Sequence, residues 1–291
     1  MANVMSVERR NTILRHLVEG NSIRSTCRLW GTNIPSVLRQ LVWAGEHCRN
    51  VLNTHLTGLQ LRHVECDEIW TFVQKKQARL TVLERETRSD IGDAYLFTAI
   101  DQDTKLIAAH TLGKRSADNA RRFMVQLANR LEMPRAGLAD DANFMKYEFP
   151  VVVQISTDGF SGYPEAVDLA FGPFAKFGVI IKDYRNATMA YTPSEMVGAD
   201  RRAVKRMSEG ELRSICTSHV ERNNLTIRTF MRRFTRLSLG FSKKFENLEA
   251  AVNLFVAYYN FCWRPGKMRV TPAMKAGVTN RMWSIDDLLA G

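Results

Sequence analysis

Two aspartates stand at positions that a purely structural role explains poorly. Asp67 lies within an expected β-strand over residues 64–73, on the apolar face of that strand. Asp158 directly follows a β-branched run over residues 151–157, which predicts a central strand buried on both faces. Open α/β sheets bind their ligands at the carboxyl ends of such strands. Because an unpaired buried carboxylate is unfavourable, the pattern indicates either an edge placement or a metal site.

A third carboxylate, Glu221, belongs to a basic helix that the sequence predicts over residues 218–234. At helical period Glu221 shares a face with Arg228 and Arg232. That face lies beside a buried stripe. Taken alone, the segment fits a solvated basic helix as well as a helix that lends one carboxylate to a metal while its arginines hold phosphate. Partner carboxylates elsewhere in the chain favour the second interpretation. The buried stripe consists of Val220, Ile227, Met231 and Phe234.

The elements that must position these residues alternate between strand and helix patterns. Further strands are expected over 94–100, 106–112 and 177–182, and helices over 116–131, 165–171 and 245–263. This is the order of the α/β ribonuclease H-like fold, a mixed five-stranded sheet with flanking helices. In that fold, acids from the first strand, the end of the fourth strand and a late helix converge. Asp140 and Asp141 lie in an expected loop over 132–150 and are interpreted as solvated.

The amino-terminal part has the pattern of a small all-α helix-turn-helix over residues 8–45. Its third helix begins after Asn33 and would direct Ser36, Arg39 and Gln40 outward, toward base edges or phosphates. A helical bundle that serves oligomer contacts is the alternative. The expected division is a DNA-binding domain at 1–55, a linker around 50–57, a catalytic domain at 60–263 with a basic insertion at 183–217, and a carboxyl-terminal tail at 264–291.

The charge of the chain indicates a polyanionic partner. Of the 291 residues, 41 are Lys or Arg and 30 are Asp or Glu, which gives a formal net charge of +11. Residues 201–244 hold twelve basic and three acidic side chains, interleaved with phenylalanines, so the excess belongs to folded structure. Nucleic acid is therefore favoured over a membrane surface.

The remaining composition predicts a cytoplasmic protein. The five cysteines are scattered and form no Cys-x-x-Cys pair, which argues against a disulfide framework and a zinc ribbon. Residues 1–11 are polar and lack the pattern of a signal peptide. No apolar run approaches the roughly 20 residues that a membrane span needs.

Several motifs in this order resemble the Asp-Asp-Glu transposases of bacterial insertion sequences, closest to the insertion-sequence-one group. The resemblance covers about residues 65–274. It implies a catalytic triad of Asp67, Asp158 and Glu221. Some relatives carry a cysteine-rich zinc finger at the amino end, which this chain lacks. The motifs are DEIWTFV at 67–73 with KK at 75–76, TDGFSGY at 157–163, HVERNNLTIR at 219–228, FSKK at 241–244, YYNFCWRP at 258–265 and TPAM at 271–274.

The resemblance implies cleavage at transposon ends, followed by strand transfer of the freed 3′-hydroxyl into target DNA. Such chemistry uses two Mg²⁺ or Mn²⁺ ions, which hard carboxylate ligands suit. At least a dimer is expected, because two transposon ends must be joined. Side chains of the late helix are expected to hold DNA, since arginine suits phosphate and amides suit base or sugar edges. They are Arg222, Asn223, Asn224, Arg228 and Arg232.

Other interpretations stay open at this point. A catalytically inactive helix-turn-helix regulator, or another ribonuclease H-like nuclease or integrase, would share many of these features. His219 could aid proton transfer or simply be packed. Glu65 and Glu68 flank Asp67 but point to mixed faces, so both are interpreted as structural. The pair Tyr258 and Tyr259 is interpreted as helix packing.

Overall fold

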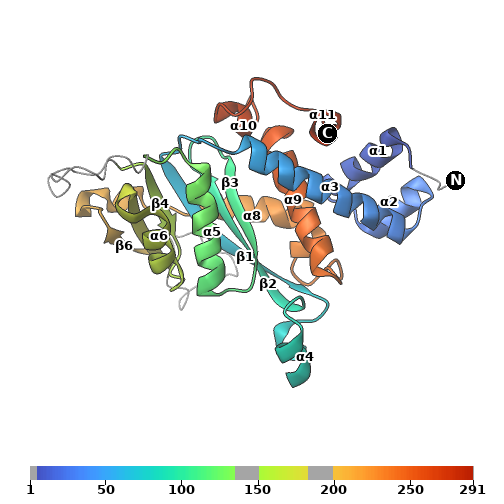
Figure 1. Ribbon diagram of the computed structural model, residues 1–291, viewed down its shortest axis with the longest axis horizontal. Helices are drawn as coiled ribbons and strands as arrows, with labels where there is room; N and C mark the ends of the chain where they lie inside the picture. The colour runs from blue at the N-terminus through green and yellow to red at the C-terminus, as the bar shows by residue number, and fades with distance from the viewer. Residues whose placement is uncertain (1–4, 135–150, 183–198, 291) are drawn as a thin grey trace.

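A computed structural model describes residues 5–134, 151–182 and 199–290 of the chain. Within these residues the protein is an α/β structure built on a six-stranded mixed sheet with flanking helices (Figure 1). Asp140, Asp141 and much of the expected insertion at 183–217 lie outside the described residues. In the described part of the chain, no helix is both long and apolar enough to cross a membrane.

The strands and helices follow the expected order, with an additional strand over residues 199–205 and additional short helices over 82–87, 272–275 and 285–289. The strands are β1 (His63–Val73), β2 (Gly92–Asp101), β3 (Ile107–Gly113), β4 (Val153–Thr157), β5 (Ala175–Lys182) and β6 (Ala199–Lys205). The helices are α1 (Val7–Val18), α2 (Ile23–Trp30), α3 (Ile34–His55), α4 (Val82–Thr87), α5 (Ala117–Arg130), α6 (Tyr163–Phe171), α8 (Ser218–Phe230), α9 (Phe245–Phe261), α10 (Pro272–Lys275) and α11 (Ile285–Leu289).

The sheet order is β3-β2-β1-β4-β5-β6, which places β1 and β4 side by side at its centre. β1, β2 and β3 are antiparallel, whereas β4 and β5 run parallel to β1. α5 and α6 pack on one face of the sheet, and α8 lies against β1 and β2 on the other. Figure 1 shows α5 in front of the sheet and α8 behind it. This arrangement is compatible with a ribonuclease H-like fold.

The expectation of five strands was wrong, because β6 pairs antiparallel with β5 at the sheet edge. β6 lies within the basic insertion expected over residues 183–217, where no strand was expected. Most of its residues are exposed or half-exposed, so it lacks the apolar alternation that marks a strand. Charged side chains such as Arg201 and Arg202 are common on edge strands, where they discourage pairing with another chain.

Two other expectations about element boundaries also need correction. The helix expected over 218–234 ends at Phe230, and Arg232–Phe234 form a separate 3₁₀ turn after Met231 adopts an extended backbone. The expected buried stripe is nevertheless confirmed, from Val220 to Phe234. The linker expected around 50–57 was wrong, because α3 continues as helix to His55.

The long helix α3 joins the amino-terminal helices to the core by packing along α9. Gly45 makes the close approach possible, since a Cβ built there would lie 2.3 Å from the Ala250 Cα. The carboxyl-terminal segment contacts the same helices. The Leu288 carbonyl lies 2.9 Å from His47 Nε2 of α3, and Asp286 accepts a hydrogen bond from the Asn11 amide of α1 at 2.8 Å. The amino-terminal helices and the carboxyl-terminal tail therefore share one packed region.

We expect Gly45→Ala to destabilise the fold by roughly 1–3 kcal/mol, because the added methyl meets backbone atoms that cannot move aside. Helix propensity alone would stabilise this variant by up to about 1 kcal/mol, so a net loss reports the clash. The measurement is the free energy of unfolding in urea. Gly210→Ala is the matched control, since only Ser208 Oγ comes as near as 4.0 Å to its built Cβ. A Gly45→Ala protein as stable as the wild type would contradict this packing.

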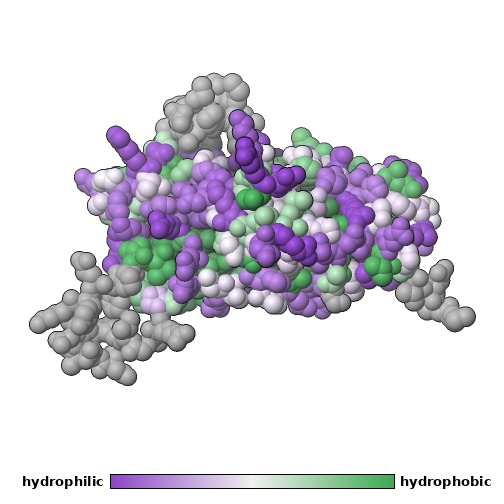
Figure 2. Space-filling view, turned by 90° about the horizontal axis from the view of Figure 1, so that it is seen from above, coloured by the Kyte–Doolittle hydropathy of each residue, from purple (hydrophilic) through white to green (hydrophobic). Residues whose placement is uncertain are grey.

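The face of the molecule seen from above in Figure 1 is mostly hydrophilic (Figure 2). Its largest hydrophobic patch lies at the left, at the end of the molecule that carries α6 and β6 in Figure 1. Leu169 of α6 and Val204 of β6 are exposed apolar side chains. Exposed apolar side chains such as these two are common on protein surfaces and need no functional explanation.

Candidate metal centre

The sheet creates a free strand edge beside Asp67. β4 pairs with β1 only as far as Thr157, which lies opposite Cys66. The next residue on β1 is Asp67, and the next on the other strand is Asp158, which has already left the sheet. On its other side Asp67 still pairs with Thr98 of β2. The two aspartates predicted from the sequence therefore meet where β4 stops and β1 continues.

Three carboxylates converge at this edge. One oxygen from each of Asp67, Glu68 and Asp158 lies within 4.8 Å of the others. Glu68 was interpreted as structural because adjacent residues of a strand point to opposite faces. The alternation of faces does not separate Asp67 from Glu68 here, because both residues lie on the part of β1 that β4 no longer covers. The sequence signal that could have identified Glu68 is its place directly after Asp67, at the point where β4 ends.

Crowding of like charges has a direct electrostatic consequence. Burial and, to a smaller extent, the neighbouring charges of Asp158 and Glu221 together raise the pKa of Asp67 to about 7. The pKa of Glu68 is raised to about 8 by burial and by the charges of Asp158 and Asp67. A divalent cation would relieve this repulsion. The cluster therefore has the electrostatic character of a cation site.

The third predicted ligand, Glu221, lies beside these carboxylates but outside the converging set. Its charge is close enough to raise the pKa of Asp67. One of its oxygens accepts hydrogen bonds from the Lys182 ammonium and, at 2.7 Å, from the Thr217 hydroxyl. The structure thus brings together two of the three predicted acids and holds the third next to them, paired with a lysine at the end of β5.

Asp67 itself is held by hydrogen bonds to both carboxylate oxygens. Oδ1 accepts from the Glu68 backbone N–H at 2.8 Å, and Oδ2 accepts from the Asn224 side-chain amide at 2.8 Å. Asn223 and Asn224 are buried, at 3% and 5% exposure, which is at odds with the DNA contacts expected of them. Asn224 positions the carboxylate of Asp67 on β1.

Glu65 fixes the start of α8, the helix that carries Glu221. Its fully buried carboxylate accepts from the backbone N–H groups of His219 at 2.7 Å and Val220 at 3.0 Å. It also faces His219 Nδ1 at 2.7 Å and accepts from the Gln102 amide at 3.0 Å. A carboxylate at a helix amino terminus is favourable both as an acceptor and in the field of the helix dipole.

A second group of potential ligands, Glu65, Cys216 and His219, also lies within 4.8 Å. Its only carboxylate already accepts four hydrogen bonds, two of them from the backbone of α8. A metal there would have to displace the bonds that anchor this helix. We therefore assign Glu65 a structural role, as expected from the sequence, and assign His219 to the same contact.

Loss of the Glu65 charge should loosen the first turn of α8. We expect Glu65→Gln to lower the free energy of unfolding by roughly 1–3 kcal/mol, because an amide supplies one acceptor oxygen in place of two. Amide hydrogen exchange at His219 and Val220 should also become faster. Urea unfolding and exchange mass spectrometry measure the two effects. Glu249→Gln, at an exposed position on α9, should change neither. Unchanged protection at Val220 in Glu65→Gln would contradict the anchoring role.

The residues expected to contact DNA are placed unevenly. Arg39, Arg222 and Arg232 are exposed, whereas Ser36, Gln40 and Arg228 are half-buried. Arg232 lines a groove of about 810 Å³ between the amino-terminal helices and the segment after α8. The same groove is lined by four other basic side chains, Arg24, Arg28, Arg233 and Lys243.

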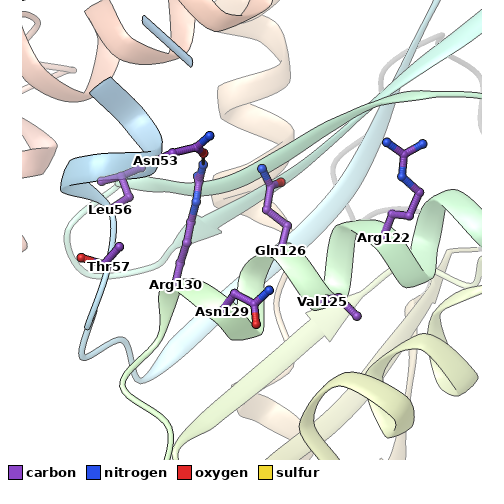
Figure 3. A pocket seen from close by; sticks show the side chains of 8 residues that line it. All are labelled: Asn53, Leu56, Thr57, Arg122, Val125, Gln126, Asn129 and Arg130. Carbon is purple, nitrogen blue, oxygen red and sulfur yellow. Dashed lines mark hydrogen bonds between the residues drawn. The ribbon is translucent and has the colours of Figure 1, made fainter. Parts of the chain in front are cut away.

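A smaller pocket of about 420 Å³ lies between the end of α3 and α5 (Figure 3). Figure 3 shows Arg130 extending from α5 toward Asn53. The Arg130 guanidinium donates to the Asn53 side-chain oxygen at 3.0 Å and to the Ala108 carbonyl at 2.7 Å. Its charge therefore ties α3 and β3 to α5. The pocket contains none of the converging carboxylates.

No model of a known protein family matches the chain, and no curated protein shows significant similarity to it. The chemistry of the site therefore carries the functional argument. Its donors are all carboxylate oxygens, which suit hard cations such as Mg²⁺ and Mn²⁺. Two oxygens on opposite sides of Mg²⁺ are about 4.2 Å apart, twice the usual bond length. Oxygens within 4.8 Å of one another fit such an ion with small side-chain adjustments.

Proposed function

We propose that this chain is a DNA transposase of the Asp-Asp-Glu class, on a ribonuclease H-like fold. The observation that carries the proposal is the convergence of Asp67 and Asp158 at the free edge of β1, with Glu221 beside them on α8. Strand order supports it as well, because the three acids come from the first strand, the end of the fourth strand and a late helix. The reaction is cleavage at the ends of an insertion sequence, followed by joining to target DNA.

In this proposal Asp67, Asp158 and Glu221 hold two Mg²⁺ or Mn²⁺ ions. When bound, such ions neutralise the charge that develops on the attacking and leaving oxygens of a phosphodiester. Asn224 keeps Asp67 in place through its 2.8 Å hydrogen bond. Lys182 pairs with Glu221, and a metal ion held by Glu221 would supply the same neutralising charge.

DNA would reach the site along the basic surface of the chain. Arg232 lies near the end of α8, and the groove it lines extends to Arg24 and Arg28 on α2. The chain thus has basic side chains between the carboxylates and the amino-terminal helices. We propose that these helices act as a helix-turn-helix, with Ser36, Arg39 and Gln40 toward the terminal repeats. A homodimer or larger assembly would hold two ends together.

The test is Mg²⁺-dependent nicking of DNA that carries the ends of the element. We expect Glu221→Gln to lower the cleavage rate about 100-fold or more, since a metal contributes several kcal/mol to stabilising the transition state. A chelator should abolish cleavage by the wild type. Glu249→Gln should cleave at the wild-type rate, and binding to the ends should survive in Glu221→Gln.

The outcomes separate the alternatives. Cleavage that persists in a chelator would contradict metal-dependent catalysis. End binding without any cleavage by the wild type would favour a helix-turn-helix regulator. Nicking of branched or unrelated DNA in preference to the ends, without strand transfer, would favour another nuclease of the same fold.

A further inference from the structure

We propose that Glu68 is a fourth carboxylate ligand of this metal centre, an inference that rests on the proposed metal-dependent function. Glu68 shares the converging set with Asp67 and Asp158, whereas Glu221 is bonded to Lys182. The free edge of β1 beyond Cys66 allows both Asp67 and Glu68 to face Asp158. The converging set of carboxylates therefore includes Glu68 and does not include the predicted third ligand, Glu221.

The strongest observation is an unsatisfied buried oxygen. The Glu68 side chain is only 3% exposed, and its Oε1 has no hydrogen-bond partner among the described residues. The Tyr163 hydroxyl, which also has no partner within hydrogen-bond distance in this part of the chain, is the neighbour best placed to donate to Glu68, and it lowers the pKa of that carboxyl. Tyr163 can offer one proton and no full charge, so a buried carboxylate oxygen beside two other carboxylates is a place where a cation would bind.

Arg115 is the nearest cation, and its contacts are too long to satisfy the site. Its guanidinium lies 3.6 Å from Glu68 Oε2 and 3.5 Å from Asp158 Oδ2. It also stacks over the Phe160 ring at 4.2 Å, which holds it at the open side of the cluster. Arg115 and Lys182 bring two positive charges to four carboxyl groups. A divalent cation would stabilise the ionised form of all four.

A structural alternative is that Glu68 serves only as the ion-pair partner of Arg115. The two roles predict different effects of Glu68→Gln. If Glu68 only pairs with Arg115, Glu68→Gln should lower the thermal stability and leave the metal affinity unchanged. If Glu68 is a metal ligand, Glu68→Gln should weaken metal binding. Its stability without added metal should then be unchanged or higher, because a buried charge is removed.

The experiment is a titration of the full chain with Mn²⁺, followed by electron paramagnetic resonance and calorimetry, with and without duplex DNA. We expect Glu68→Gln to weaken Mn²⁺ binding about 10–100-fold. Loss of a residue that merely hydrogen-bonds a metal ligand has an effect of that size, so loss of a ligand should have at least as large an effect. Glu249→Gln should bind as the wild type does. Arg115→Gln, at a half-exposed position, should bind Mn²⁺ more tightly, because a competing cation is removed.

Equal Mn²⁺ affinity in wild type and Glu68→Gln would overturn the assignment of Glu68 while leaving the proposed function intact. Failure of the wild type to bind Mn²⁺, with or without DNA, would overturn both. If Glu68→Gln does not fold, Glu68→Asp takes its place, because it keeps the charge but shortens the reach of the carboxylate. Mn²⁺ affinity equal to that of the wild type in Glu68→Asp would then overturn the assignment of Glu68.

Discussion

Like charges are crowded where β4 stops and β1 continues, and the surrounding structure is arranged to tolerate them. Burial and the charges of neighbouring carboxylates raise the pKa of Asp67 and of Glu68. Such an arrangement persists only if neighbouring groups compensate for it. A cation is the simplest compensation, and the all-oxygen donor set selects a hard one. This electrostatic constraint links the sheet register to the proposed chemistry.

Each element around the cluster contributes one stabilising contact. α8 is anchored by Glu65 at its first turn, and the same helix presents Asn224 to Asp67. β5 ends at Lys182, which pairs with Glu221. Arg115, just before α5, faces Glu68 and Asp158. Two cations thus stand beside four acids in the described residues.

Much of this architecture could be predicted from the sequence. Periodicity located Asp67 within a strand and Asp158 after one, and the structure confirms both positions. Cap residues such as Ser116 marked helix starts correctly. Glu68 was missed because alternation along a strand says nothing about where the neighbouring strand ends. β6 was missed because an exposed edge strand carries charges in place of an apolar face. The burial of Asn223 and Asn224 depends on how α8 is rotated against its neighbours, which the polarity of an amide side chain does not indicate.

The central claim is that the carboxylates of Asp67 and Asp158 share a divalent cation. Anomalous X-ray diffraction from crystals of the full chain soaked in Mn²⁺ tests it most directly. The account predicts an anomalous peak in contact with oxygens of both aspartates. At saturating Mn²⁺, the absence of a peak there, or a single peak at Glu65, Cys216 and His219, would contradict it.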